Sequence, residues 1–387
     1  QRGVRCTVLD RHPHPASEGS SGVAGIFHGV VHGSDGAHSQ IYRAAALHAA
    51  YSHAQAIAAG VEGAVGGLLR VTDQAIPAMQ AQCRALGLPR AWADALTAES
   101  ASALSGIDVT SNAWHFPHGG WINPQALVRW LLDHEAITVE GGVEVQALMP
   151  QQQGWQLLDQ QQRVISSADV VIVANALDAT RLLPHALWPL AQSRGQSTLL
   201  PANTPGLKAP RLPLSGNGYA VTRRDGSVLC GASSHAGDNA ASARDSDLQD
   251  NLEKLRQLTC GDVDTKTPMG AAIHHVGWRT LTPDRLPIVG AVPALHATHT
   301  SDNVHRIARE PGLYALTALG SRGLTLAPLM AEVVAASILR EPVPLAAPLP
   351  RIAPVPAAGE EPAAGSQLAA AEDPASEGEP ASEGEPA

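Results

Sequence analysis

A glycine-punctuated turn that leads into a long apolar segment constrains the fold of this chain more than any other feature. The turn is Gly320-Ser321-Arg322-Gly323-Leu324, and the apolar helix expected after it extends through Glu332. The first amides of a helix lack partners within the helix and lie at the positive end of its dipole, so such a turn suits an electron-rich ligand edge. An alternative stays open, in which the glycines only permit the positive φ of a helix entry.

The composition indicates a globular protein with a large core. Of the 387 residues, 44% are hydrophobic, which is enough for two interleaved domains. We find no apolar stretch of the roughly 18 to 20 residues that a membrane span requires, and no signal-like segment. The four cysteines lie far apart without C-x-x-C spacing. His28 and His32 are four residues apart but lie in an extended stretch, and His274 and His275 are adjacent, so neither pair has helical metal-ligand geometry. We therefore expect a soluble, cytoplasmic protein with no membrane contact and no metal.

The net charge of −10 is concentrated at one end of the chain. Residues 352–387 carry eight acidic side chains and no Lys or Arg, which leaves 28 acidic against 26 basic residues elsewhere. Charge thus neither supports nor excludes an RNA partner. We expect residues 346–387, which repeat Pro-Ala-Ser-Glu-Gly-Glu, to form a disordered acidic tail. A specific acidic docking peptide is the open alternative.

The first and middle parts of the chain predict a doubly wound α/β unit. Residues 4–10 form an apolar strand that closes on Asp10, and a carboxylate at that point can hold a ribose hydroxyl or simply cap a turn. Asn123 and Pro124 mark a helix start, and we expect this helix to run to about Glu135. The other expected elements are a helix over 39–59, strands over 143–148 and 155–158, and a central parallel strand over 170–175.

A change of pattern near residue 193 predicts an antiparallel sheet, the usual material of a substrate domain. Segments 218–221 and 228–232 flank the turn at Arg224-Asp225-Gly226, and a polar helix over 245–258 follows. Arg279 lies on a later strand, where it can be a salt-bridge residue or an anion clamp at a site.

The combined motifs resemble the D-amino-acid-oxidase-type flavoproteins. Within these, Gly320–Leu324 with Ala327-Pro328-Leu329 is similar to the FAD-dependent oxidoreductase domain of bifunctional tRNA 5-methylaminomethyl-2-thiouridine biosynthesis proteins. The resemblance covers residues 1 to about 345. It also rests on Phe116–Trp121, Gly195-Gln196, Gly218-Tyr219, Gly231-Ala232-Ser233 and Gly277–Pro293.

The resemblance implies an α/β fold, α+β overall, with a Rossmann-like FAD-binding domain interleaved with an antiparallel-sheet substrate domain. It places 1–75, 119–192 and 277–345 in the first domain, and 76–118 and 193–276 in the second. It implies that Arg279 grips a substrate carboxylate and that Tyr219 lines the same pocket. The implied FAD contacts are Asp10, Ser20, Ser21, Gly22, Val145, Ala174, Gly320, Ser321, Arg322, Gly323 and Leu324.

The implied reaction is FAD-dependent oxidation of the carboxymethylaminomethyl group on a tRNA wobble uridine, which leaves aminomethyluridine and glyoxylate. A methyltransferase domain precedes this domain in the family. Three departures are visible: Val23 follows Ser20-Ser21-Gly22, Ala176 replaces a glycine, and the Gly-x-Gly-x-x-Gly turn is absent. Two alternatives therefore remain, namely an oxidase of glycine or small N-alkyl amino acids, and an inactive remnant without FAD.

Overall fold

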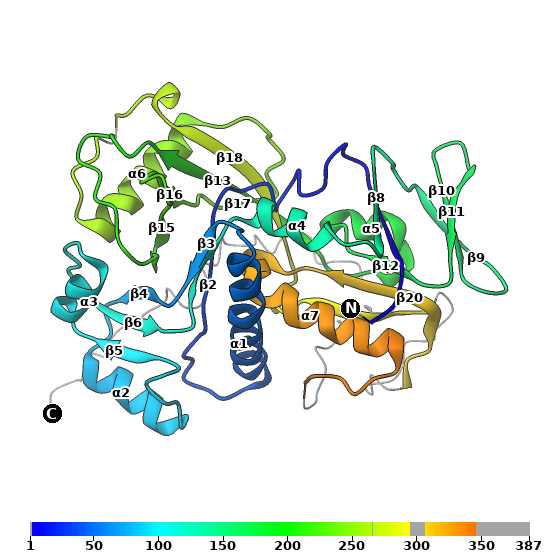
Figure 1. Cartoon of the computed structure of the whole chain (residues 1–387), viewed down its shortest axis with the longest axis horizontal. Coiled ribbons are helices and arrows are strands. Elements are labelled where there is room, and N and C mark those ends of the chain that lie inside the picture. The colour runs from blue at the N-terminus through cyan, green and yellow to red at the C-terminus, as the bar shows by residue number, and fades with distance from the viewer. Residues whose placement is uncertain (1, 265, 295–305, 346–387) are drawn as a thin grey trace, which may run out of the picture.

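The computed structural model describes residues 2–264, 266–294 and 306–345. Antiparallel and parallel sheets are mixed with helices, so the fold is α/β in the broad sense that the sequence predicted (Figure 1). The expected acidic tail over 346–387 lies outside the described residues.

The largest sheet has nine strands in the order β17-β13-β16-β15-β14-β4-β6-β5, with β18 paired to β13. The expected hairpin at residues 224–226 is present between β15 and β16. Helix α6 (Asp245–Thr259) packs its leucines against this sheet and closes a core with Leu214, Val228 and Cys230. The strands are β4 (Leu68–Thr72), β5 (Asp94–Leu96), β6 (Asn112–Phe116), β13 (Ala191–Leu200), β14 (Leu214–Gly216), β15 (Gly218–Thr222), β16 (Val228–Gly231), β17 (His235–Ala236) and β18 (Ile273–Leu281).

Strand β4 joins this sheet from an unexpected part of the chain. It pairs with β14 in parallel and with β6 antiparallel, although the expected cofactor domain includes residues 1–75. Helices α2 (Ile76–Ala85) and α3 (Ala98–Ser105) flank β5 and β6 at the same end of the molecule (Figure 1).

Two smaller sheets, one parallel and one mixed, lie outside the nine-stranded sheet; in the mixed sheet the middle strand pairs in parallel on one side and antiparallel on the other. One pairs β1 (Cys6–Asp10) with β8 (Ile137–Gly141), and the other orders β12 (Val171–Val173), β20 (Arg309–Thr317) and β19 (Ile288–Pro293). No ladder joins the two sheets within the described residues. The expectation of a central strand over 170–175 is therefore wrong, because β12 is paired on one side only and Ile172 is 46% exposed.

Tertiary pairing also shifts two other predicted elements. Helix α4 (Pro124–Leu132) begins as expected, with the Asn123 side chain accepting a hydrogen bond from Ala126 N–H, but it ends before Glu135. The chain turns there because β8 pairs with β1. The strand expected over 143–148 is instead β9 (Ala147–Pro150), which pairs with β10 (Trp155–Leu158) beside β11 (Val164–Ala168).

Helices α1 (Ala37–Ala58) and α7 (Gly323–Leu339) pack together and on β19. The short turn η5 (Gly320–Arg322) precedes α7. One helical segment in the described part of the chain, 320–339, is long and apolar enough to cross a membrane, which contradicts our reading of the sequence. Its residues Leu326, Met330 and Val333 are buried in the protein core, so α7 packs as a core helix.

The remaining short elements connect these layers. A small sheet orders β2, β7 and β3 next to α1. Their bounds are β2 (Gly25–Phe27), β3 (Gly63–Val65), β7 (Gly120–Ile122), η1 (Ala176–Asp178), α5 (Ala179–Leu182), η2 (Pro184–Ala186) and η3 (Met269–Ala271).

Candidate active site

Arg279 is a partly buried cation on strand β18. Its Nη1 donates a hydrogen bond to the Ser233 carbonyl oxygen at 3.4 Å. Among the described residues, no Asp or Glu forms a salt bridge with Arg279. Burial lowers the pKa of the Arg279 guanidinium, and the nearby Tyr219 opposes this shift. A desolvated guanidinium without a carboxylate partner is costly, so this position favours an anionic ligand.

Strand pairing gives Arg279 its place. Along β13 and β18, Ser193 is paired with Arg279 and Gly195 with Gly277. The guanidinium occupies space next to Gly195 that a side chain at residue 195 would fill. Residue 195 is therefore glycine for a physical reason, because the Arg279 guanidinium lies so close to the backbone there.

Tyr219 shares this environment. Burial raises the pKa of its phenol, while the Arg279 charge and a hydrogen bond with Ser197 lower it. The hydroxyl therefore stays protonated at neutral pH and is available to donate or accept a hydrogen bond. Arg279 and Tyr219, which lie 60 residues apart in the sequence, are brought together by β15 and β18 on one sheet.

The segment with Ser20, Ser21 and Gly22 reaches the same sheet. His275 on β18 donates from Nε2 to the Ser21 carbonyl oxygen at 2.8 Å. A β-carbon at Gly19 would lie 2.9 Å from the Trp278 carbonyl oxygen, so the two backbones are in close contact. These contacts place Ser20, Ser21 and Gly22, which the resemblance implies as FAD contacts, beside the strand that carries Arg279.

The glycine turn meets the far end of that strand. Gly320 has a φ of +56°, and a β-carbon there would lie 2.7 Å from Leu281 Cδ2. The Arg322 amide donates to the Leu319 carbonyl at 3.2 Å, so this amide is not free, contrary to our expectation for the turn. Gly323 is helical, with a φ of −52°, and its nearest neighbour in the side-chain direction is 4.0 Å away. Gly323 and Leu324 thus begin α7, where helix geometry leaves the first amides without helical partners.

Asp10 and Ala174 lie at the carboxyl ends of β1 and β12, and Val145 lies between β8 and β9. The Asp10 carboxylate accepts from the His12 amide at 2.8 Å, and the Asp10 carbonyl accepts from the Val143 amide at 2.9 Å. Ala174 directly follows β12. Shortly after it, Asp178 in η1 forms an ion pair at 3.9 Å with Arg11, the residue that follows β1. The turn-capping role that the sequence left open for Asp10 is therefore present.

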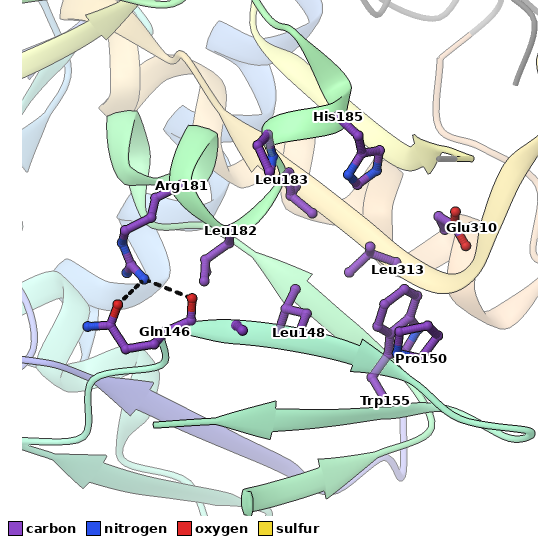
Figure 2. A pocket seen from close by; sticks show the side chains of 12 residues that line it. Gln146, Leu148, Pro150, Trp155, Arg181, Leu182, Leu183, His185, Glu310 and Leu313 are labelled. Atoms are coloured by element: carbon purple, nitrogen blue, oxygen red, sulfur yellow. Dashed lines mark hydrogen bonds between the residues drawn. The ribbon is translucent and has the colours of Figure 1, made fainter. Parts of the chain in front are cut away.

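A cavity of about 290 Å³ lies elsewhere, between the β9–β10 hairpin and α5 (Figure 2). Arg181 at its edge donates to the Gln146 carbonyl and side-chain oxygens, at 3.2 and 3.0 Å. None of the site residues predicted from the sequence lines this cavity. Its apolar side chains include Leu148, Trp155, Leu183 and Leu313.

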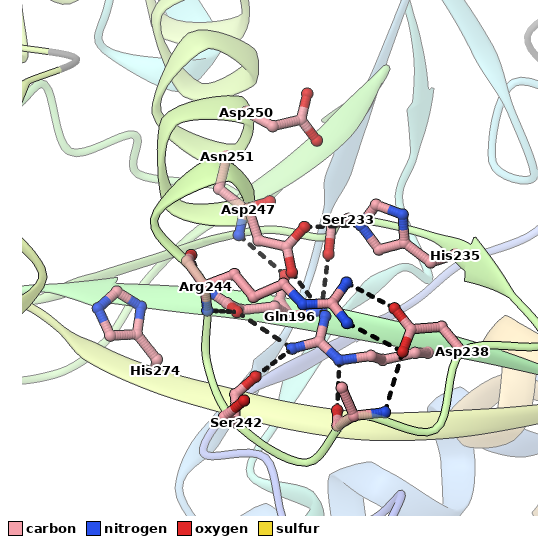
Figure 3. A network of polar contacts seen from close by, with 12 residues as sticks. Gln196, Ser233, His235, Asp238, Ser242, Arg244, Asp247, Asp250, Asn251 and His274 are labelled. Carbon is pink, nitrogen blue, oxygen red and sulfur yellow. Dashed lines mark hydrogen bonds and ion pairs between the residues drawn. The ribbon is translucent and has the colours of Figure 1, made fainter.

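A buried polar network surrounds β13, the strand that pairs with β18 (Figure 3). Arg194 Nη1 contacts Asp247 at 2.5 Å, and the same carboxylate contacts His235 Nε2 at 2.6 Å. Gln196 and Ser233 are joined twice, through the Gln196 amide to Ser233 Oγ and through the Ser233 amide to the Gln196 carbonyl, both at 3.0 Å. These bonds fix Ser233, whose carbonyl oxygen is the acceptor for Arg279.

Sequence reasoning missed several residues of this neighbourhood. Ser197 and Ser233 carry polar atoms next to Tyr219 and Arg279, and their one sequence signal is their place beside the Gly195 and Gly231 motifs. His28 and His53 contact the Gly320–Leu324 turn through side chains. No local pattern marks these two histidines, because their partners lie 271 to 294 residues away in sequence.

Comparison with protein families extends over nearly the whole chain. The family model "DAO: FAD dependent oxidoreductase" matches residues 1–337. The tRNA 5-methylaminomethyl-2-thiouridine biosynthesis bifunctional protein MnmC of Methylibium petroleiphilum is 39% identical over 366 residues. The corresponding Burkholderia pseudomallei protein (strain 1106a) is 36% identical over 359 residues. The matches cover 90% and 89% of this chain but 55% and 54% of those proteins, so the chain spans about half their length.

Solved structures share the fold. Glycine oxidase from Geobacillus kaustophilus superposes with a TM-score of 0.69 at 18% identity, over 90% of each chain. Iminodiacetate oxidase from Chelativorans sp. BNC1 gives a TM-score of 0.63 at 20% identity, over 89% of this chain and 91% of that one.

Proposed function

The chain belongs to the DAO family of FAD dependent oxidoreductases, and from this premise we propose that it oxidises an amine that carries a carboxymethyl group. The observation that carries the proposal is Arg279, a partly buried cation whose guanidinium donates a hydrogen bond to the neutral Ser233 carbonyl. A carboxylate is the ligand that a planar guanidinium holds at two points.

The residues present fit FAD at its two ends. In the first turn of α7, Thr325 carries a buried hydroxyl oxygen that has no hydrogen-bond partner among the described residues, and the side-chain position of Gly323 is open. Gly320, Ser321, Arg322, Gly323 and Leu324 would hold the flavin edge, together with Ser20, Ser21 and Gly22. Asp10 would hold the ribose, and Val145 and Ala174 would border the adenosine and diphosphate.

FAD, when bound, supplies the capacity to accept a hydride from a C–H bond next to nitrogen. The protein's part is orientation. Arg279 fixes the carboxylate of the substrate's carboxymethyl group. The neutral Tyr219 hydroxyl limits rotation of that group, so its methylene carbon is held in one geometry. The first amides of α7 favour negative charge at their end of the site.

The finer proposal is that the amine is the carboxymethylaminomethyl arm of a tRNA wobble uridine. The arm is an N-substituted glycine, so Arg279 can grip its carboxylate. Removal of a hydride from the methylene carbon of the neutral amine, R–NH–CH₂–COO⁻, gives the protonated imine R–NH⁺=CH–COO⁻. Water then adds to this carbon, and the C–N bond breaks to release glyoxylate and leave aminomethyluridine. The names of the Methylibium and Burkholderia relatives favour this substrate. We further propose a cytoplasmic location and, in the full-length protein, an upstream methyltransferase domain.

The proposed division into two domains follows the sheets. We propose that 1–75, 119–192 and 277–345 form the FAD-binding domain, apart from β4 and the end of β18, and that 76–118 and 193–276 form the substrate domain, whose sheet includes β4 and the whole of β18. The substrate end of the site then lies on the nine-stranded sheet.

Two experiments test the proposal. The visible absorbance of the purified chain, before and after incubation with FAD, should show a flavin spectrum that stays with the protein through gel filtration. The flavinated protein should then release glyoxylate from tRNA that carries the carboxymethylaminomethyl group. Turnover of free glycine with no turnover of tRNA would favour an amino-acid oxidase. A protein that rejects FAD would favour the inactive remnant.

A further inference from the structure

We propose that His28 and His53 are positioning residues that clamp the Gly320–Leu324 turn from two sides. The inference rests on the proposed function, in which this turn holds the flavin edge. Both histidines are buried, at 4% and 1% exposure. They come from different elements, since His28 follows β2 and His53 lies on α1.

His53 replaces a backbone donor that α7 lacks. In a helix, the Leu324 carbonyl would accept from the amide of residue 328, but residue 328 is proline and has no N–H. His53 Nε2 lies 2.8 Å from that carbonyl oxygen. A carbonyl only accepts, so Nε2 carries the proton. Nδ1 is then unprotonated, and it is buried without a hydrogen-bond partner.

His28 holds the other side of the turn in the opposite tautomer. Its Nε2 lies 3.1 Å from Arg322 Nη1, and a guanidinium only donates, so Nε2 is the acceptor. Nδ1 then carries the proton, which it donates to the Gly29 carbonyl at 2.5 Å. The His28 ring also packs on Phe116, with ring centroids 5.2 Å apart. The bond to Arg322 therefore requires a neutral ring, whereas Nδ1 can donate to Gly29 in either protonation state.

The packing around the two rings transmits their positions to the turn. Phe27 meets the His53 ring edge-on at 4.7 Å, and a β-carbon at Gly25 would lie 2.6 Å from Leu324 Cδ1. Strand β2, helix α1 and helix α7 thus converge on Leu324 without spare volume. Loss of the His53 bond leaves the Leu324 carbonyl without its donor, and loss of the His28 bond removes one contact of the Arg322 guanidinium.

The clamp makes FAD retention sensitive to acid. Protonated His28 loses its acceptor and faces the cations Arg322 and Arg70, while protonated His53 faces His48 and gains a buried N–H without a partner. We therefore expect the Kd for FAD to rise as the pH falls toward the native pKa values of the two rings, which burial holds below the ordinary histidine pKa of about 6.5.

The test compares His53→Leu with His53→Gln, whose side-chain amide can still donate near the Nε2 position. His48→Leu on the same helix is the control. Titration by flavin fluorescence at pH 8 should give a Kd about tenfold higher for His53→Leu, and within about threefold of wild type for the other two. His28→Leu should behave like His53→Leu and should lose the acid-dependent rise in Kd that His28 contributes.

A measurement without FAD separates this inference from the proposed function. Amide hydrogen exchange of residues 320–330 in the FAD-free protein should be about tenfold faster in His53→Leu than in His53→Gln or His48→Leu. Equal exchange and equal Kd in His53→Leu and wild type would overturn the clamp. If no variant binds FAD but His53→Leu still exchanges faster, the clamp stands and the flavin role of the turn fails.

Discussion

Gly195 and Arg279 lie so close across β13 and β18 that a β-carbon at residue 195 would stand 2.7 Å from Arg279 Nη2. We expect Gly195→Ala to displace the guanidinium and to raise the KM for a carboxylate substrate about tenfold, because the ion pair depends on its geometry. Steady-state kinetics measure this, with the visible flavin spectrum as the control for cofactor content. A mutant with unchanged KM would show that the guanidinium position is not critical.

Arg279→Ala should lower kcat/KM by about a hundredfold or more and leave FAD bound, since Arg279 contacts the substrate in our proposal and not the cofactor. The matched variant Arg279→Lys keeps the charge without the planar fork, so we expect an intermediate loss. The measurement is glyoxylate release together with the flavin-to-protein absorbance ratio. Loss of flavin from Arg279→Ala, or undiminished turnover, would contradict the carboxylate clamp.

Gly323→Val should weaken FAD binding with little effect on the fold. The protein itself leaves the side-chain position of Gly323 open, with Leu319 Cβ 4.0 Å away, and the backbone is helical there. We expect the Kd for FAD to rise at least about tenfold, while the unfolding free energy of the FAD-free protein changes by less than about 1 kcal/mol. Gly323→Ala is the graded control. Full flavin content in Gly323→Val would place the cofactor elsewhere.

Stability should fall in mild acid because of His28 and His53. Burial lowers the pKa of both rings, and for His28 the Arg322 and Arg70 charges add to this. A lowered pKa means that the unfolded chain binds protons first, so the stability is complete above about pH 6.5 and declines as the pH falls toward the native values. Each ring should remove at most about 1.4 kcal/mol per pH unit in that window. Urea unfolding at pH 7.5 and 5.5 measures the difference, and a smaller difference in His28→Leu identifies its source.

The Arg194–Asp247 pair predicts a large stability effect from removal of one partner. Both side chains are buried, at 0% and 3% exposure, and Arg194 also donates to the Ala240 and Ser242 carbonyls. Arg194→Ala leaves the Asp247 carboxylate buried beside His235 alone, which should cost about 3 to 5 kcal/mol in unfolding free energy. Arg256→Ala, whose ion pair with Glu253 is exposed, should cost less than about 1 kcal/mol. Similar losses in the two variants would contradict this account.

Local sequence rules identified most of the secondary structure that surrounds the site. Asn123 caps α4 as predicted, the turn at residues 224–226 joins β15 and β16, and Arg279 lies on a strand. These features depend on residues within a few positions of one another, where capping and turn chemistry act. The glycine turn before α7 was found for the same reason.

The errors arose where distant segments decide the outcome. The chain leaves α4 before Glu135 because β8 pairs with β1, and β12 is exposed on one side because no described strand pairs there. The helical segment 320–339 is long and apolar enough to cross a membrane, but its helix α7 packs on α1 and β19. Apolar periodicity reports that a segment is buried, but it does not say by which neighbour.

The sequence by itself determined the family and the broad α/β class, and it supplied the residues of the proposed site, because motifs and hydrophobic patterns are local properties of a chain. The tertiary structure decided which of these residues meet. It enclosed Arg279 beside Tyr219, set Gly195 against the guanidinium, and brought His28 and His53 to the turn before α7. Such contacts join residues up to 294 positions apart, and they form only when the sheets and helices pack, because burial and hydrogen-bond geometry are properties of the assembled core.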